Sequence, residues 1–282
     1  MLEDVLPFLV CPVCDGGFAA GAPRSSTLAC LSGHTFDVAR SGYVNLASGA
    51  ALPEGDATSM VLAREAFLGS GAFEPVSAAL ADAAALAAGQ RSAGCVVDLG
   101  AGTGHYLARV LDRLGGYVGL ALEASKPALK RAAHCHPRAG AVGCDTRGKL
   151  PVRTGGAQLC LDVFAPRNGA EIHRILHRDG ALLVITPSAR HLVELREPLG
   201  LLEVDPKKTE RLQAQLDPWL EPVDIRAVEF GLALTRVQAQ SLVGMGPSAR
   251  HLGGEAIVGR LAALPEPIST TVSVRVSMHR PR

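Results

Sequence analysis

Short apolar runs alternate with longer amphipathic segments through the middle of the chain. The apolar runs have the length of buried strands and span residues 95–99, 117–122, 140–144, 158–164 and 181–186. The segments that alternate with them are predicted to be helices and span residues 104–114, 126–134, 169–177 and 189–197. This alternation predicts an α/β fold with a mostly parallel sheet covered on both faces, so a ligand is expected beyond the carboxyl ends of the strands.

The flanking parts of the chain carry simpler patterns. Helices are predicted at 58–68 and 74–88, after a stretch at 47–57 that is rich in Ala, Gly, Pro and Ser and is interpreted as a linker or mobile loop. Residues 269–277 alternate strictly between apolar and polar, which is typical of a strand with one buried face. Together with a strand near 227–234, it would complete a seven-stranded sheet.

A glycine-rich turn follows the strand at 95–99. Asp98 lies at the strand end, and Gly100, Gly102 and Gly104 follow with the spacing G-x-G-x-G. Glycine tolerates positive φ and lets a ligand approach the backbone, and the helix after it offers unpaired N–H groups. Dinucleotide-binding folds use a related turn, so the glycines alone are a weak signal. The string D-L-G-x-G-x-G resembles the first motif of class I S-adenosylmethionine-dependent methyltransferases.

An acidic residue closes the next strand. Glu123 stands about twenty residues beyond the glycines, the place from which a carboxylate binds ribose hydroxyls in nucleotide-binding α/β folds. The turn and this acid together favour S-adenosylmethionine over NAD as the ligand. An α/β turn that binds no nucleotide is the alternative.

Four potential metal ligands lie near the N-terminus. Cys11, Cys14, Cys30 and His34 have the spacing C-x2-C-x15-C-x3-H, which suits one tetrahedral ion held between two turns. Three thiolates and one imidazole leave no open position, so the pattern predicts structural zinc rather than catalytic zinc. Chance cysteines are the alternative. A disulfide framework is less favoured because nothing in the sequence indicates secretion.

Composition sets few limits on function. The chain has 282 residues, 48% of them hydrophobic, and a formal net charge of +1 from 28 Lys and Arg against 27 Asp and Glu. That balance does not indicate nucleic-acid binding. Three basic residues that follow predicted strands, Arg147, Lys149 and Arg167, are nevertheless candidates for phosphate contacts. An equally good interpretation is that they are solvated charges on loops. Without an apolar run of membrane length or a basic leader, we expect a cytoplasmic protein with neither a membrane span nor a signal peptide.

Several further strings carry a family resemblance. They are C-P-V-C…C…G-H-T-F-D from residue 11, S-G-Y-V-N-L at 41–46, R-E-A-F-L-G-S-G-A-F at 64–73, D-L-G-A-G-T-G at 98–104, F-A-P at 164–166 and T-P-S-A-R-H-L-V-E-L at 186–195. The chain resembles the 23S rRNA (guanine-N1)-methyltransferases over nearly its whole length, and their tylosin-resistance branch most. The resemblance implies a class I methyltransferase fold (Rossmann-like, with a seven-stranded, mostly parallel sheet) preceded by a zinc module.

The resemblance also implies domains, site residues and partners. We expect a zinc-binding module at 1–46, a linker and helices at 47–92 and the catalytic domain at 93–282. It implies a 23S rRNA hairpin as substrate, a zinc module that helps to hold RNA, and a possible homodimer. Cofactor contacts are implied in and around the glycine turn, at Phe73, Asp98, Gly100, Gly102, Thr103, Gly104, Glu123 and His191.

Methylation of guanine N1 requires removal of a proton from that atom. A general base, or a group that stabilises the O6 anion, is therefore expected. Asp162 at the end of the strand 158–164 is our candidate to receive or orient the proton, and Phe164 is our candidate to stack on the guanine. A polar strand end and a core phenylalanine are equally good interpretations. Other functions left open are a methyltransferase for a small molecule of antibiotic or quinone biosynthesis, and a non-catalytic RNA-binding protein.

Overall fold

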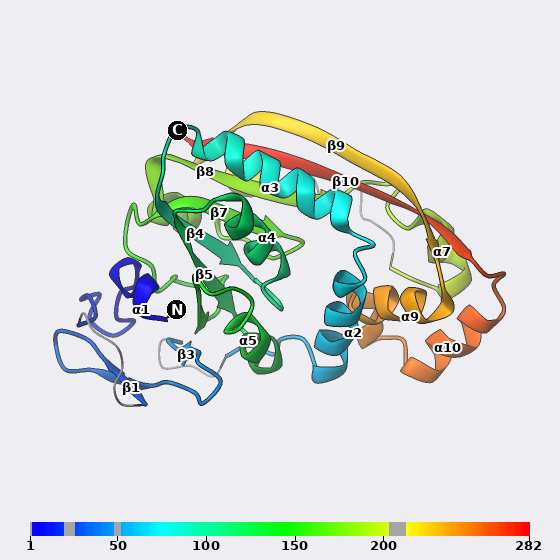
Figure 1. Cartoon of the computed structure of the whole chain (residues 1–282), viewed down its shortest axis with the longest axis horizontal. Helices are drawn as coiled ribbons and strands as arrows, with labels where there is room; N and C mark the ends of the chain where they lie inside the picture. Colours follow the sequence, from blue (N-terminus) through cyan, green and yellow to red (C-terminus); the bar gives the residue numbers. More distant parts are fainter. Residues whose placement is uncertain (1, 20–25, 48–51, 203–212) are drawn as a thin grey trace.

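A twisted sheet with helices on both faces forms the centre of the protein (Figure 1). The computed structural model describes residues 2–19, 26–47, 52–202 and 213–282. Within them the large sheet has eight strands in the order β3-β6-β5-β4-β7-β8-β10-β9. Their bounds are β3 Val44–Asn45, β4 Gly94–Leu99, β5 Tyr117–Glu123, β6 Ala139–Gly143, β7 Ala157–Val163, β8 Leu176–Pro187, β9 Leu220–Leu234 and β10 Ile268–Pro281.

The expected seven-stranded arrangement is present, with one addition. Strands β3 to β8 pair in parallel, and β10 runs antiparallel to both β8 and β9. The addition is β3, a two-residue strand that pairs with β6 and comes from the N-terminal segment. The strand expected near 227–234 begins earlier, at Leu220, because it pairs with β10 along almost its full length.

Helices from most of the chain share the apolar core on the first face of the sheet. They are α2 Thr58–Gly69, α3 Glu74–Ala88, α4 His105–Arg113, α5 Lys126–Ala132, α7 Val193–Leu199, α9 Arg236–Gly244 and α10 Gly254–Ala262, with the short η2 Pro247–Arg250 between the last two. Figure 1 shows α3 along β8 and β10, α9 next to α2, and α10 next to α9. One continuous apolar core joins these helices to the sheet.

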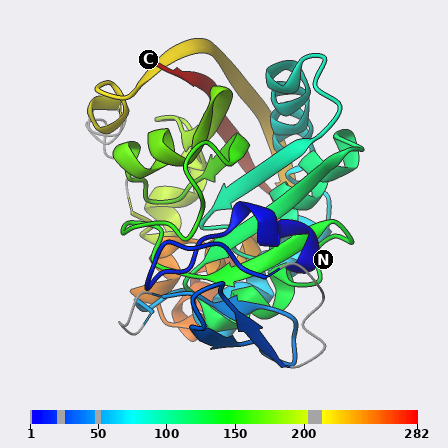
Figure 2. The same cartoon turned by 90° about the vertical axis from the view of Figure 1, so that its left-hand side faces the viewer.

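The N-terminal segment packs against the second face. Helix α1, Leu2–Val5, and the turn η1, Leu6–Phe8, bury their apolar side chains in one core with β5 and β6. The connection from β6 to β7, residues 144–156, contains no helix, and α1 and η1 pack on this side of the sheet together with α6, Gly169–Ile175. Figure 2 shows the N-terminal segment in front of the sheet.

The strands β1, Thr27–Ala29, and β2, Thr35–Asp37, form a small antiparallel hairpin. An isolated bridge between Leu9 and Val152 joins the N-terminal segment to the connection from β6 to β7, and another between Val38 and Val44 joins the end of the hairpin to β3. Residues on both sides of the expected domain border at residue 46 thus share one core. The border itself stays a prediction.

One helix begins later than expected. The pattern predicted a helix over 189–197, but α7 begins at Val193 because Leu192 has the left-handed φ of +55°. The backbone N–H groups of Ser188 and Leu192 donate to carbonyls of β10, which holds the segment 188–192 against that strand. His191 therefore lies before the helix and not on it.

Two other segments are only partly described: the linker predicted at 47–57, and a charged segment at 205–217 to which the sequence assigned no purpose. Residues 52–57 are irregular, as predicted, whereas 48–51 lie outside the described residues. In the charged segment 205–217, residues 205–212 lie outside the described part and 213–216 are helical, with Leu216 buried in the second-face core. None of the described helices is long and apolar enough to cross a membrane.

Candidate functional site

The four predicted metal ligands meet in the N-terminal module. Their ligand atoms all lie within 4.8 Å of one another. The Sγ atoms of Cys14 and Cys30 are 3.8 Å apart, and His34 Nδ1 is 3.7 Å from Cys11 Sγ and 3.4 Å from Cys30 Sγ. Bonds of about 2.3 Å from a tetrahedral zinc ion to thiolates give an edge of about 3.8 Å between ligands, so this set has the size of a zinc site.

The glycine turn forms a cradle at the end of β4. Gly100, Gly102 and Gly104 have φ of +70°, +57° and +80°. A Cβ on Gly104 would lie 2.6 Å from Cys135 Sγ, and one on Gly100 would lie 2.9 Å from the Cβ of Ala165. Side chains at these positions would be both strained and obstructed. Helix α4 begins directly after the turn, at His105.

Glu123 is fixed against this turn by backbone groups. Its Oε2 accepts a hydrogen bond from the N–H of Gly102, and its Oε1 accepts from the N–H groups of Ala124 and Ser125, each at 2.8 Å. Because each carboxylate oxygen has two lone pairs, one acceptor site on Oε2 remains for a hydroxyl donor. The structure thus places the predicted ribose ligand directly beside the predicted glycine turn.

Three acidic residues at the ends of neighbouring strands form what we call the acidic cluster: Asp98, Glu123 and Asp162. Asp98 is 2% exposed, and burial, followed by the negative charges of Glu123 and Asp162, raises the pKa of its carboxyl to about 8. A cation bound among these groups would relieve their repulsion and favour the charged form of Asp98. The cluster suits a ligand that carries positive charge.

Asp162 itself is fully buried and paired with a cation. Its Oδ2 lies 2.8 Å from Arg167 Nε, and Arg167 Nη2 donates to its Oδ1 at 3.1 Å. The N–H of Ala165 also donates to Oδ1, at 3.3 Å. The pair fixes the loop that carries Phe164 and Ala165. The role of Asp162 in proton transfer stays a prediction.

Aromatic rings line the neighbouring space. His191 lies between Phe73 and Phe164, with ring centroids 6.2 Å and 6.1 Å away, and the second pair is stacked. Phe164 is 44% exposed and has a φ of +57°, an uncommon conformation that is often found at functional sites. The N–H of Ser273 donates to His191 Nδ1, and burial, followed by Arg196, lowers the pKa of this imidazole to about 4.

Comparison with known proteins gives relatives of full length. The chain is 46% identical to a 23S rRNA (guanine(748)-N(1))-methyltransferase of Streptomyces fradiae, over 100% of this chain and 99% of the relative. It is 49% identical to a protein of Micromonospora griseorubida named as a 23S rRNA (guanine-N(1)-)-methyltransferase, over 100% of both chains. The chain belongs to the 23S rRNA (guanine-N1)-methyltransferase family.

The zinc module has a family model of its own. Residues 9–48 match the zinc ribbon described as "RlmA, N-terminal", and this range contains all four ligands. The prediction of structural zinc is thereby confirmed. Membership of the methyltransferase family makes S-adenosylmethionine the cofactor, and the cradle, Glu123 and the acidic cluster fit this cationic sulfonium compound.

Solved structures support the fold alone. The MccD protein and the YcgJ protein of Bacillus subtilis each superimpose with a TM-score of 0.50 over 72% of this chain. The superpositions cover 96% of the MccD chain at 11% sequence identity and 98% of the YcgJ chain at 16%. The class I arrangement of the sheet is therefore shared with proteins whose sequences have diverged far from this family.

The sequence did not predict that a group of charged residues lies over the glycine turn. Arg64 of α2 lies over Gly102, where a Cβ would be 3.3 Å from its Nη1. Arg64 is ion-paired with Asp56, and Asp56 also binds Arg250 of η2 at 3.2 Å. Ser125 Oγ donates to the carbonyl of Asp56 at 2.7 Å. Arg64 opens the string at 64–73, but only the fold shows that these distant residues meet over the cradle.

Proposed function

We propose that this enzyme transfers a methyl group from S-adenosylmethionine to N1 of a guanine in a 23S rRNA hairpin loop and so confers resistance to tylosin-type macrolides. The observation that carries the proposal is the full-length relation, at 46% identity, to the Streptomyces fradiae enzyme. Because the name of that relative specifies guanine 748, we propose the equivalent nucleotide as the target. A small-molecule substrate would leave the zinc ribbon without a purpose.

The first task of the chain is to orient the methyl donor. Bound S-adenosylmethionine supplies an electrophilic methyl group on a positively charged sulfur. We assign the ribose hydroxyls to Glu123 and the methionine part to the turn at Gly100, Gly102 and Gly104. Thr103, half-buried in that turn, and Phe73 and His191 would complete the pocket. Asp98 stabilises the positive charge once its own carboxyl is ionised.

The second task is to present guanine N1 in line with the methyl group. A paired base is inaccessible, so the target would be a loop guanine or one rotated out of its stack. Phe164 offers an exposed ring next to the cradle, since its neighbour Ala165 borders Gly100. Stacking there would hold the base edge towards the donor, where a separation of about 3–3.5 Å between reacting atoms is needed.

The third task is to handle the N1 proton. Asp162 lies at the strand end beside this loop, and we propose that it receives or orients the proton while Arg167 holds it in place. Asp162→Asn tests this role in single-turnover methylation of an RNA hairpin. We expect the rate to fall and its dependence on pH to change. Rates close to those of the unchanged enzyme at every pH would contradict the role.

The reaction as a whole is tested by mapping reverse-transcriptase stops. N1-methylguanine cannot form a Watson–Crick pair, so 23S rRNA incubated with the enzyme and donor should stop the transcriptase at the target. Glu123→Ala is the control for donor binding, because it removes the carboxylate assigned to the ribose, and circular dichroism checks that the variant is folded. Transfer of labelled methyl groups to metabolites and not to rRNA would contradict the proposal.

Three further expectations accompany this function. We propose that residues 1–46 form a zinc-binding module that helps to hold RNA, that 47–92 lead into the catalytic domain, and that 93–282 form that domain. We also propose that the enzyme works in the cytoplasm, where ribosomal RNA is found. A homodimer remains a proposal from the resemblance, to be tested by sedimentation with and without an RNA hairpin.

A further inference from the structure

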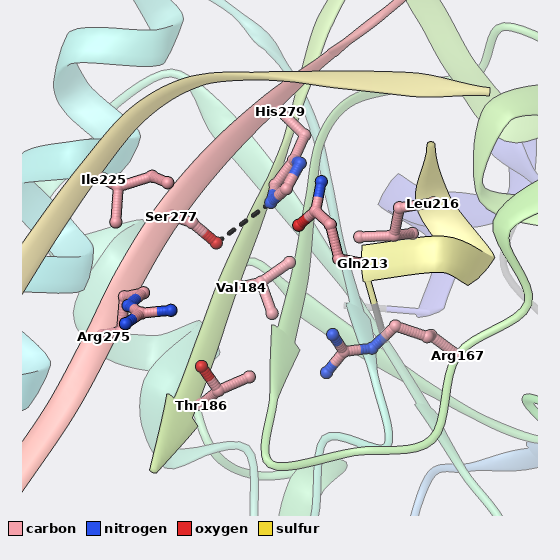
Figure 3. A pocket seen from close by; sticks show the side chains of 9 residues that line it. All are labelled: Arg167, Val184, Thr186, Gln213, Leu216, Ile225, Arg275, Ser277 and His279. Atoms are coloured by element: carbon pink, nitrogen blue, oxygen red, sulfur yellow. Dashed lines mark hydrogen bonds between the residues drawn. The ribbon is translucent and has the colours of Figure 1, made fainter. Parts of the chain in front are cut away.

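A small polar cavity lies on the second face of the sheet, away from the glycine turn. It has a volume of about 40 Å³ and lies between β8, β10, β9 and the helical residues 213–216 (Figure 3). Figure 3 shows two guanidinium groups, an imidazole, an amide and hydroxyl groups around it. We call it the basic cavity; its lining residues are Arg167, Val184, Thr186, Gln213, Leu216, Ile225, Arg275, Ser277 and His279.

His279 contributes an unused polar atom to this cavity. The residue is 2% exposed, and its Nε2 lies 3.0 Å from Ser277 Oγ. Its Nδ1 is buried and has no hydrogen-bond partner among the described residues. Buried polar atoms in folded proteins are nearly always satisfied, so a group that enters the cavity, either a water molecule or a ligand, supplies the partner.

The charges around the cavity favour an anion. Arg275 is exposed on β10 and forms no ion pair within the described parts of the chain. Arg167 uses Nε and Nη2 for Asp162, which leaves Nη1 available. None of the lining residues is acidic. The negative charge of Asp217, which does not line the cavity, raises the pKa of His279 slightly against the lowering by burial and Arg167. Asp217 also accepts a hydrogen bond from Gln213.

A larger hollow adjoins the basic cavity, on the other side of Arg167. Its volume is about 280 Å³, and Arg147, Arg167, Asn168, Gln215 and Trp219 contribute to its wall. Trp219 is 40% exposed and is the one tryptophan of the chain. An exposed indole beside guanidinium groups suits single-stranded RNA, in which bases stack on aromatic rings and phosphates pair with arginine.

We propose that the basic cavity binds a backbone phosphate of the substrate RNA and that Trp219 stacks on a base of the neighbouring nucleotide. Arg167 lines both hollows and also pairs with Asp162 at the proposed reaction site, so it connects this surface to that site. The nucleotides would be those that flank the target guanine. This inference rests on the proposed function in one respect, namely that the substrate is RNA.

Arg275→Ala in the full-length, zinc-loaded enzyme tests the phosphate contact. We expect the KM for an RNA hairpin to rise about tenfold. The slope of the logarithm of RNA affinity against the logarithm of salt concentration should become shallower by about one unit, because one phosphate contact is lost. The kcat at saturating RNA and the affinity for S-adenosylmethionine should not change. Arg275→Lys should retain most of the RNA affinity, because it retains the charge.

Arg113→Ala is the matched control. Arg113 is an exposed arginine of α4 on the opposite face, and its loss removes the same charge. It should leave the KM for RNA and the salt dependence unchanged. Equal effects of Arg113→Ala and Arg275→Ala would mean that only net charge matters, and would overturn the proposal.

The fluorescence of Trp219 reports on occupancy and on the source of the phosphate. RNA should quench it in the unchanged enzyme, and Arg275→Ala should shift the quenching to higher RNA concentration. Titration with inorganic phosphate is the second arm. Strong quenching by inorganic phosphate, at concentrations where RNA has no effect, would identify a free phosphate ligand and overturn the RNA assignment.

The inference and the proposed function can fail separately. If the unchanged enzyme methylates no RNA, the proposed function fails, whereas quenching by the hairpin still reports on the cavity. If the enzyme methylates RNA, but Arg275→Ala has the KM and salt dependence of the unchanged enzyme, the inference fails and the function stands.

Discussion

Two buried sites of opposite charge lie on either side of the Asp162–Arg167 ion pair. In the acidic cluster, burial and neighbouring carboxylates raise the pKa of Asp98 to about 8. In the basic cavity, burial and the charge of Arg167 lower the pKa of His279 to about 4. Asp98 and His279 are thus both held in their neutral forms. A cationic ligand would favour ionisation of Asp98, and an anionic ligand would favour protonation of His279. One site suits a cationic methyl donor, the other a phosphate.

Zinc removal should produce the largest difference between the two sites, because it should weaken RNA binding far more than donor binding. Metal binding provides much of the folding free energy of a zinc ribbon, about 10–16 kcal/mol in isolated peptides. The ribbon shares its core with the second face, as do Val184 and Leu216 in the wall of the basic cavity. We therefore expect chelation to abolish RNA binding, and to reduce donor affinity less than tenfold, in calorimetry of the two ligands. Equal losses of both affinities would contradict this division.

Glu123→Ala should affect the acidic cluster alone. Loss of a carboxylate that accepts a hydroxyl hydrogen bond costs about 1.5–3 kcal/mol, or about tenfold to a hundredfold in donor affinity. Calorimetry with S-adenosylhomocysteine measures this loss. RNA affinity, measured by Trp219 fluorescence, should stay within twofold. If the donor affinity of the variant is unchanged, Glu123 does not bind the ribose.

His279 should make stability depend on pH. Its folded pKa of about 4 lies below its unfolded value of 6.5, so the unfolded state binds more protons between these values. The contribution of His279 to the free energy of unfolding should therefore be complete above pH 6.5 and should fall by about 3 kcal/mol as the pH is lowered to 4. Asp98 contributes with the opposite sign, because its folded pKa of about 8 lies above its unfolded value. Urea unfolding across this range measures the slope. The difference in slope between the unchanged enzyme and His279→Gln isolates the contribution of His279, because His191 and Asp98 contribute to both proteins.

Asp98 should release a proton when the donor binds, which is the smallest of these effects. Its carboxyl is largely protonated at pH 7, and the positive charge of S-adenosylmethionine should lower its pKa. Calorimetry at pH 7 in buffers of different ionisation enthalpy counts the protons. We expect a release that approaches one proton for S-adenosylmethionine and a smaller one for S-adenosylhomocysteine, which lacks the sulfonium charge. Equal release by both compounds would contradict the proposed charge relief.

Features set by local sequence were predicted correctly. The carboxyl ends of β4 to β8, the glycine turn and the spacing of the zinc ligands each depend on residues close together in the chain, where glycine conformation and side-chain periodicity decide the structure. The starts of β8 and β9 were placed too late, because pairing with neighbouring strands extends both of them. His191 was assigned correctly to its segment but to the wrong element. Its backbone segment forms hydrogen bonds with β10 instead of joining the helix, and the residues of β10 that make this contact, Thr271 and Ser273, are far away in the sequence.

The basic cavity shows why the rest could not be predicted. In β10, Arg275, Ser277 and His279 alternate with apolar residues, and the pattern correctly predicted one buried face. The polar face looked like an ordinary solvent-facing surface. Only the packing of residues 213–216 against β8 and β10 encloses it and makes His279 a buried, unsatisfied group.

The sequence by itself determined the sheet, the metal ligands and the place of the glycine turn, because these follow from short-range spacing and backbone conformation. Tertiary structure decided which charges face one another: the convergence of Asp98, Glu123 and Asp162, the pairing of Asp162 with Arg167, and the enclosure of the basic cavity. Electrostatic interactions depend on distance in space and on the exclusion of water, and neither can be obtained from separation along the chain.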